Sequence, residues 1–211
     1  QLNDWVTARV RLGTDWFEQL TKEVYPFYSQ DTPEGGFVES SAFRQETNLE
    51  ALITANRQLS SDFTLNVNGG ANMRRNEFDL KEAGSRKLNV PDIYNVSNSA
   101  SPPLLNNIVQ YKEVNSLYGL VTLGFREFAF LDVTARNDWS STLPEDNRSY
   151  FYPSFSGSLV FTDAFDMSSD FLSFGKVRGS WAKVGNDANP YQLTSVYSET
   201  DKFGNIPGFT T

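Results

Sequence analysis

The sequence contains no cysteine and no histidine. The missing cysteines exclude disulfide bonds and thiolate metal sites, and the missing histidines exclude acid–base chemistry built on an imidazole. No apolar run approaches the roughly 20 residues that a transmembrane helix needs. The first residues, Gln1 to Trp5, have neither a basic patch nor an apolar core. We therefore expect any signal peptide to lie outside this sequence.

Basic residues are also in short supply. The chain has 18 Lys and Arg against 26 Asp and Glu, a formal net charge of −8. This balance argues against a nucleic-acid partner, whose phosphates are neutralised by Lys and Arg. Hydrophobic residues make up only 39% of the chain, whereas aromatic residues reach 14%. That combination fits strands wetted on one face and bordered by amphipathic rings, and it fits a sugar-binding β-sandwich equally well.

Alternation of apolar and polar residues is the main pattern that is present. In the segment from Leu131 to Arg136, Leu, Val and Ala alternate with Asp, Thr and Arg. A polar link, Ser140 to Arg148, follows and carries residues that favour a turn. The chain then returns with a second alternating stretch that ends at Phe161. A strand with one apolar and one polar face lies between two different environments.

The same alternation predicts seven strands. Besides the returning strand that ends at Phe161, they are Trp5 to Phe17, Phe43 to Gln58, Phe63 to Glu77, Glu113 to Phe125, Phe128 to Trp139 and Phe174 to Val184. Gly69-Gly70 predicts a bulge or bend inside the third strand. A helical turn is expected around Ala164 to Met167. The tail, Gly185 to Thr211, is expected to end without a closing strand.

The links between these strands alternate in length. Leu59 to Asp62 and Arg126-Glu127 are tight, whereas Glu18 to Ala42 and Phe78 to Lys112 are long. Outer-membrane barrels have short periplasmic turns and longer extracellular loops. The pattern therefore predicts an all-β fold, an antiparallel transmembrane β-barrel. Plugged transporter barrels have about 22 strands, so seven strands would be a partial wall.

Two long strings carry a resemblance to a known family. They are RNDWSSTLPEDNRSYFYPS and FLSFGKVRGSWAKVGNDANPYQL, with weaker similarity in DWVTARVRLGTDW, LSSDFTLNVNGGANMRR and VNSLYGLVTLGFREFAFLDVT. They resemble the barrel of the SusC/RagA-like TonB-dependent outer-membrane transporters of Bacteroidetes-type bacteria. The resemblance implies import of glycan oligomers or peptides, a SusD-like surface lipoprotein as a lid, contact with lipid and LPS, and TonB acting through a plug domain. We expect residues 1–211 to be a barrel fragment, with plug and signal peptide outside this sequence.

The candidate lumen-facing residues are those at the polar positions of the alternating strands. They are Arg9, Arg11, Asn66, Asn68, Thr134, Arg136, Ser156 and Arg178. The charged ones either bind an anionic or sugar ligand or form ion pairs with lumenal acids or a plug. The candidate extracellular contacts are Tyr94, Tyr111, Asn186, Asp187 and Tyr191. These either meet substrate or a lid protein, or they only cap the barrel.

Chemistry beyond binding is not expected. Asp15, Glu50 and Asp132 occupy ordinary polar-parity positions, and no nucleophile–base pair or phosphate loop is present. The oxygens of Asn186, Asp187 and Asn189 fall short of the six to eight ligands of a calcium site. We expect no catalytic residue, no metal and no cofactor. Two alternatives to the transporter stay open: a soluble all-β carbohydrate-binding module and a passive porin.

Overall fold

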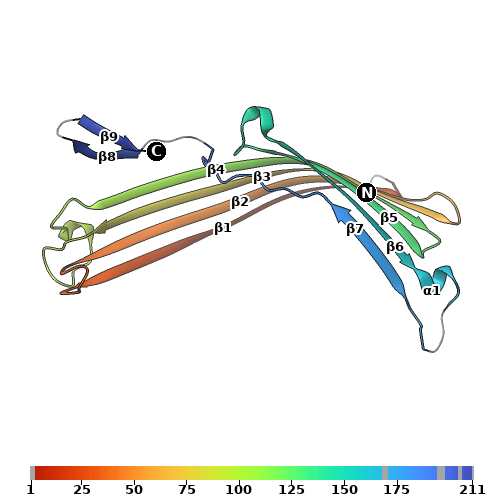
Figure 1. Ribbon diagram of the computed structural model, residues 1–211, viewed down its shortest axis with the longest axis horizontal. Helices are drawn as coiled ribbons and strands as arrows, with labels where there is room; N and C mark the ends of the chain where they lie inside the picture. The colour runs from red at the N-terminus through yellow and green to blue at the C-terminus, as the bar shows by residue number, and fades with distance from the viewer. Residues whose placement is uncertain (1–2, 168–170, 194–197, 204–205, 211) are drawn as a thin grey trace. The chain divides into compact units, whose positions relative to one another are not determined.

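The computed structural model describes residues 3–167, 171–193, 198–203 and 206–210. Seven strands form one sheet in chain order, each beside its sequence neighbours (Figure 1). Their bounds are β1 Val6–Phe27, β2 Glu34–Gln58, β3 Phe63–Ser85, β4 Leu104–Phe125, β5 Ala129–Ser140, β6 Ser149–Val160 and β7 Lys176–Ala182. The order and the antiparallel pairing are those of a barrel wall that is not closed. The predicted all-β, antiparallel fold class is confirmed.

Three short helical elements lie in the links between the strands. Two single 3₁₀ turns occupy Val96–Asn98 and Glu145–Asn147, and the helix α1 spans Phe161–Ala164. The strands β8 (Ser198–Phe203) and β9 (Ile206–Thr210) pair only with each other. Within the described residues, no helix has the length and apolarity that crossing a membrane demands.

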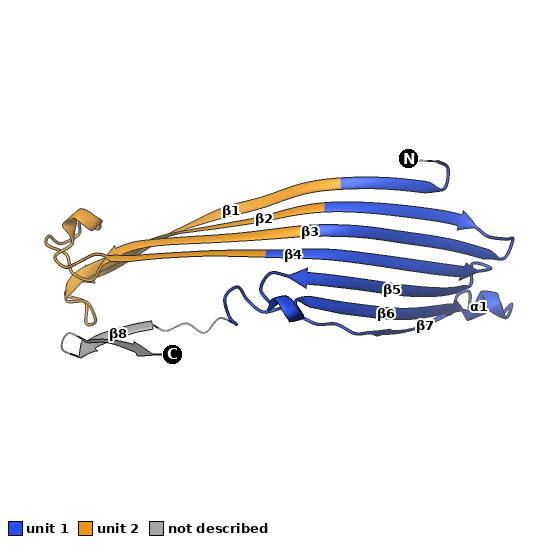
Figure 2. Ribbon diagram, turned by 90° about the horizontal axis from the view of Figure 1, so that it is seen from above, with its two compact units in different colours: residues 1–10, 50–73, 113–211 blue, residues 11–49, 74–112 orange. Residues whose placement is uncertain are grey.

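The chain divides into two compact units. Unit 1 contains Gln1–Val10, Glu50–Met73 and Glu113–Thr211, and unit 2 contains Arg11–Leu49 and Arg74–Lys112 (Figure 2). Strands β1 to β4 contribute residues to both units, whereas β5, β6 and β7 belong to unit 1 alone. The strands β5 and β6 have 12 residues each, and β1 to β4 have 22 to 25. About 9–11 residues of a tilted strand cross a bilayer, so β1 to β4 are roughly twice the crossing length.

The sheet of unit 1 has one apolar face. The register aligns Val121, Val133, Phe155 and Trp181 in one row across β4 to β7. The rings of Phe155 and Trp181 stack with centroids 6.0 Å apart. Side chains of this face stay accessible: Leu117 is 59% exposed and Phe151 is 56% exposed. Soluble monomers rarely expose contiguous apolar patches of more than a few hundred Å², so a row of exposed apolar side chains marks a surface that contacts protein or membrane.

A hydrophobic core is almost missing from the described residues. Only four apolar side chains are buried there, namely Phe37, Leu88, Val114 and Val160. A soluble sandwich of this length would bury the inner faces of two sheets against each other. The seven-stranded sheet has no such buried layer in the described residues. The carbohydrate-binding-module alternative, which requires one, does not fit.

Two of the expected loops, both in unit 2, are largely wrong, because the structure has strand over much of each. The segment from Glu18 to Ala42 was expected to be a loop, but β1 runs to Phe27 and β2 begins at Glu34. Likewise, Phe78 to Lys112 contains the end of β3 and the start of β4, and the connection is residues 86–103. The alternation fades there because both faces carry polar side chains. Backbone pairing continues regardless of side-chain polarity, which is why the pattern missed these strand extensions.

The connection 86–103 is folded onto the strands of unit 2. Leu88 is buried, and its backbone pairs with that of Ser99. The Asn98 side chain is also buried; its amide nitrogen donates to the carbonyls of Val90 and Ile93 at 2.7 Å each, and its oxygen accepts from the Val90 amide. These contacts hold the connection in one conformation, in contrast to the long unpatterned loop that the sequence suggested.

Four smaller expectations concern single elements. The strand β3 runs without interruption through Gly69-Gly70, and the expected bulge or bend there stays a prediction. The helical turn begins at Phe161, three residues before the expected start at Ala164. The tail was expected to end without a closing strand, and its strands β8 and β9 pair with each other and do not join the seven-stranded sheet. The polar link is confirmed, since β5 ends at Ser140 and β6 begins at Ser149.

Candidate functional site

The polar face of unit 1 is the candidate site, and its side chains are arranged in rows across β4, β5 and β6. The register defines three rows: Ser116, Asp138 and Tyr150; Tyr118, Arg136 and Tyr152; and Thr122, Asp132 and Ser156. Side chains directly opposite each other in antiparallel strands have Cβ atoms roughly 5 Å apart. The rows therefore place carboxylates, hydroxyls, tyrosines and one guanidinium within reach of one another.

Arg136 is the cation at the centre of these rows. Its Nε donates to Asp138 Oδ1 at 2.7 Å, and its Nη2 donates to Ser116 Oγ at 2.9 Å. The guanidinium also lies 5.7 Å from the centroid of the Tyr118 ring, within cation–π range. These contacts come from two strands, so the charge is fixed in place and paired with one carboxylate.

Tyr118 extends the network to β2. Its hydroxyl donates to Glu50 Oε1 at 2.7 Å, although strand β3 lies between β4 and β2. The ring crosses β3 at Gly70, where a Cβ atom would lie 2.6 Å from the ring. Any side chain at position 70 would collide with the ring and displace it. The Tyr118 side chain therefore passes over Gly70 to reach Glu50.

Asp132 is a carboxylate held by hydroxyls. Its Oδ1 accepts from Thr122 at 2.6 Å, and its Oδ2 accepts from Ser156 at 2.9 Å. No cation pairs with it in the described part of the chain. The Asp132 carboxylate thus joins β4, β5 and β6 on the polar face through two hydroxyl groups.

An amide ladder continues the polar face on β2 and β3. Thr54 donates to Asn68 at 2.7 Å, Asn68 donates to Asn66, and Asn66 donates to Asn56. Beside it is a hollow of about 350 Å³, lined by Asn56, Arg57, Gln58, Thr64, Leu65, Asn66, Thr122 and Phe130. The hollow therefore offers amide and hydroxyl groups together with the guanidinium of Arg57.

Two tyrosines and the tail close the other end of the rows. The rings of Tyr150 and Tyr152 are nearly parallel, with centroids 6.3 Å apart. Ser140 Oγ donates to Asp187 Oδ2 at 2.7 Å, which ties the tail to the end of β5. A Cβ atom on Gly185 would lie 3.2 Å from the Tyr152 ring, so the tail passes close to this ring. Asp187 thus lies beside the polar network.

The two tight turns are joined at the opposite ends of the strands. Arg126 Nε donates to Asp62 Oδ1 at 2.9 Å, and the backbone amide of Arg126 donates to the Asp62 carbonyl at 2.8 Å. The hydrogen bond to the Asp62 carboxylate raises the pKa of Arg126. Rings of Phe63 and Phe125 pack beside the turns, with centroids 4.9 Å apart.

The expected extracellular contacts fall in different places. Lys22 Nζ donates to the Tyr94 carbonyl at 3.0 Å, and the Tyr94 hydroxyl donates to Asp92 at 3.2 Å. Burial of the ring, and then the bond to Asp92, raise the pKa of Tyr94. Tyr111 was expected in a loop, which is wrong, because it lies within β4. Tyr191 is exposed in the tail and has a positive φ of 61°. Whether these residues, with Asn186 and Asp187, contact a substrate or partner stays a prediction.

The expected lumen-facing residues share the polar face wherever the pairing can be followed. Asn66 and Asn68 lie in the amide ladder, Arg136 and Ser156 lie in the rows, and Thr134 is opposite Leu120 and Ser154. Arg178 is opposite Ser158. Arg9 and Arg11 alternate with Val10 and Leu12 on β1. That this face lines a lumen is a prediction. Sequence reasoning missed the bridge from Tyr118 to Glu50; each residue has the polar parity of its own strand, but that pattern does not show which strands lie side by side.

A single sheet with an exposed apolar face and a hydrogen-bonded polar face defines a class of protein: the wall of a transmembrane β-barrel, which hydrocarbon covers outside and water fills inside. No group of three or more Asp or Glu side chains able to hold a metal ion is present among the described residues.

Comparison with known proteins supports this class. The chain is 23% identical over 159 residues to the TonB-dependent receptor P26 of Formosa agariphila, a match that covers 73% of this chain and 16% of that protein. It superposes on the RagAB peptide transporter with a TM-score of 0.85 at 19% identity, over 99% of this chain and 24% of that one. It superposes on the RagAB peptide importer in its closed-closed state with a TM-score of 0.84 at 18% identity, over 100% of this chain and 24% of that one. No family model matches.

These matches confirm the resemblance to the SusC/RagA-like TonB-dependent transporters and the outer-membrane β-barrel fold. The chain spans about a sixth of the length of the curated relative and about a quarter of the superposed transporter chains. The activity of the whole protein is therefore a matter for proposal.

Proposed function

We propose that this chain is part of the barrel wall of a TonB-dependent transporter in the outer membrane, and that the whole protein imports oligomeric nutrients. The observation that carries the proposal is the two-faced sheet. Its apolar face, from Leu117 to Trp181, is open, while its polar face carries hydrogen-bonded side chains, among them Tyr118 with Glu50 and Ser140 with Asp187. Hydrocarbon covers the first face, and the second lines the path of the substrate.

The other components of the proposed transporter follow from the resemblance to the SusC/RagA-like family. A plug domain outside residues 1–211 closes the lumen, and TonB acts on the plug. A SusD-like surface lipoprotein covers the extracellular mouth, and the apolar face meets membrane lipid and LPS. This chain has no role in catalysis: it supplies wall, lumen lining and extracellular connections.

Oligopeptides are the first choice of substrate, and glycan oligomers are the second. The superposed transporters are named for peptides, and the polar face offers peptides both charged and amide partners. Arg136 and Asp132 suit charged groups, while the ladder from Thr54 to Asn56 suits backbone amides. A glycan would use the stacked Tyr150 and Tyr152 rings instead.

Uptake measurements test the proposal. Cells with and without the whole gene are given labelled oligopeptides or labelled oligosaccharides, with TonB present or deleted. Gene-dependent uptake that requires TonB supports the transporter, and the label that enters identifies the substrate class. Uptake of both labels that survives TonB deletion would instead indicate a passive porin.

A further inference from the structure

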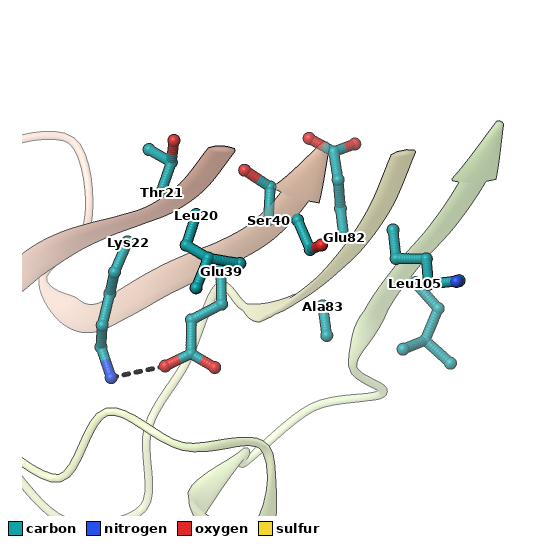
Figure 3. A pocket seen from close by; sticks show the side chains of 10 residues that line it. Leu20, Thr21, Lys22, Glu39, Ser40, Glu82, Ala83 and Leu105 are labelled. Carbon is teal, nitrogen blue, oxygen red and sulfur yellow. Dashed lines mark hydrogen bonds and ion pairs between the residues drawn. The ribbon is translucent and has the colours of Figure 1, made fainter. Parts of the chain in front are cut away.

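Unit 2 has a groove of about 620 Å³, and its lining includes Leu20, Lys22, Glu39 and Leu105. Lys22 and Glu39 form an ion pair at 2.5 Å within this lining, as Figure 3 shows. Leu20 and Leu105 are 75% and 74% exposed, so these two side chains of the lining stay uncovered. The polar face of unit 1 differs from this groove, because a segment of the chain itself lies against it.

That segment is residues 183–187, which follow β7 directly and are here called the strap. The strap contacts β6 through Gly185. A Cβ atom on Gly185 would lie 3.2 Å from the Tyr152 ring and 3.9 Å from the Tyr150 ring. Both tyrosines belong to the polar rows and stack on each other. The strap therefore lies against the aromatic pair of the polar face.

The strap contacts β5 through Asp187. Its Oδ2 accepts a hydrogen bond from Ser140 Oγ at 2.7 Å. Ser140 has the parity of Arg136 and Asp138 on β5, so it belongs to the polar face. Although it is the last residue of β5, it is only 2% exposed. A hydrogen bond to a carboxylate is stronger than one between neutral groups, so this contact is a latch between the strap and the sheet.

Apart from this latch, the strap is weakly attached to the sheet. The bond from the Lys183 amide to the Pro153 carbonyl, at 3.0 Å, is the last backbone hydrogen bond between sheet and tail in the described residues. The next residue, Val184, is 83% exposed. Segments with few backbone hydrogen bonds and little burial open at a small cost in free energy. The strap can therefore leave the polar face while the pairing of β6 and β7 stays intact.

We propose that the strap is a gate on the polar face, which the bond between Ser140 and Asp187 holds closed in this structure. The inference rests on the proposed function, in which the polar face lines the path of the substrate. A substrate that stacks on Tyr150 or Tyr152 needs contacts of about 3.5–4 Å with the ring atoms. Gly185 already lies at this distance from both rings. Substrate and closed strap therefore exclude each other where Gly185 lies, and passage requires the strap to open.

The first experiment locks the strap in the whole transporter, from which any other cysteine has been removed. The chain has no cysteine, so Ser140→Cys combined with Asp187→Cys places a single pair at the latch. Cells with this double variant receive the labelled oligopeptides and oligosaccharides before and after oxidation. We expect disulfide formation to lower TonB-dependent uptake at least tenfold, and a reductant to restore it. Each cysteine alone is a matched control, whose uptake should not depend on the oxidant.

The second experiment measures the cover over the rings without any transport. Hydroxyl-radical footprinting of the purified whole transporter reports how accessible the Tyr150 and Tyr152 side chains are. Asp187→Ala removes the acceptor of the latch, so oxidation of the two rings should become at least threefold faster. Asn189→Ala, at an exposed position two residues further along the tail, is the matched control and should leave the rate unchanged.

The outcomes separate the two proposals. If uptake of both labels by cells with the wild-type gene is independent of the gene or of TonB, the proposed function fails, whereas footprinting still decides whether the strap covers the rings. If the double variant forms its disulfide and keeps full uptake, the strap is a fixed part of the wall and the inference alone is wrong. Unchanged oxidation of both rings in Asp187→Ala would also overturn it.

Discussion

The hydroxyl of Tyr118 on β4 donates a hydrogen bond to Glu50 on β2, across the strand that separates them. The two residues are 68 positions apart in the sequence, and only the glycine at position 70 leaves room for the ring. Three consecutive wall strands are thus connected by one side chain on the polar face. The same tyrosine lies against Arg136, so the bridge extends to β5.

Gly70→Ala should displace Tyr118, because its Cβ would lie 2.6 Å from the ring. We expect a loss of about 1–3 kcal/mol in the free energy of unfolding, the usual cost of overpacking. Urea unfolding of the whole transporter in detergent measures it. Gly69→Ala is the matched control, since nothing lies within 4 Å of its Cβ position. Equal effects from the two substitutions would contradict this account.

Val133→Arg should destabilise the barrel by about 2–4 kcal/mol if Val133 lies near the bilayer midplane. Thr134→Arg, on the polar face, should cost much less, because water or polar groups surround it. Heat-modifiability on gels and denaturant unfolding in lipid vesicles compare the two variants. If Thr134→Arg proved the more damaging, the assignment of the two faces would be reversed.

Glu127→Gly should stabilise the turn between β4 and β5. The Phe128 amide bonds the Phe125 carbonyl, and Arg126 and Glu127 both have positive φ, 48° and 61°. This is the geometry of a type I′ turn, which favours glycine. We expect a gain of up to about 1 kcal/mol from relief of backbone strain. Arg126→Gly gains the same freedom and loses the bond to Asp62, so it should be less stable than Glu127→Gly. The reverse order would show that the bond to Asp62 contributes nothing.

Asn98→Ala should open the connection 86–103. Three hydrogen bonds of a buried amide are lost, and the Val90 and Ile93 backbone groups lose their partner. An unsatisfied buried group costs about 1–3 kcal/mol. Trypsin cleavage after Arg86 or Lys87 in the whole transporter should therefore accelerate at least fivefold. Ser97→Ala, at the exposed neighbouring position, should leave the rate unchanged. Wild-type protection of Asn98→Ala would mean that other contacts hold the connection.

The sequence alone was sufficient for the fold class and for the two faces. Strict alternation in stretches such as Leu131 to Arg136 is a local property, since each side chain's direction depends only on its position along the strand. The tight turns at Asp62 and Arg126 are also local, and the structure places both where the residue types indicated. The resemblance to a transporter barrel came from contiguous strings, which need no tertiary information.

Tertiary structure decided what depends on partners distant in the sequence. Strands β1 and β3 extend to Phe27 and Ser85 because neighbouring backbones continue to pair, although no apolar pattern marks the extension. The folded state of the connection 86–103 depends on Asn98 meeting Val90 and on Leu88 being buried. The sequence suggested a bulge or bend at Gly70. In the structure, its missing side chain leaves the space that the Tyr118 ring occupies. Hydrogen bonds and close contacts between strands set these features, and a one-dimensional pattern carries no record of which strand lies beside which.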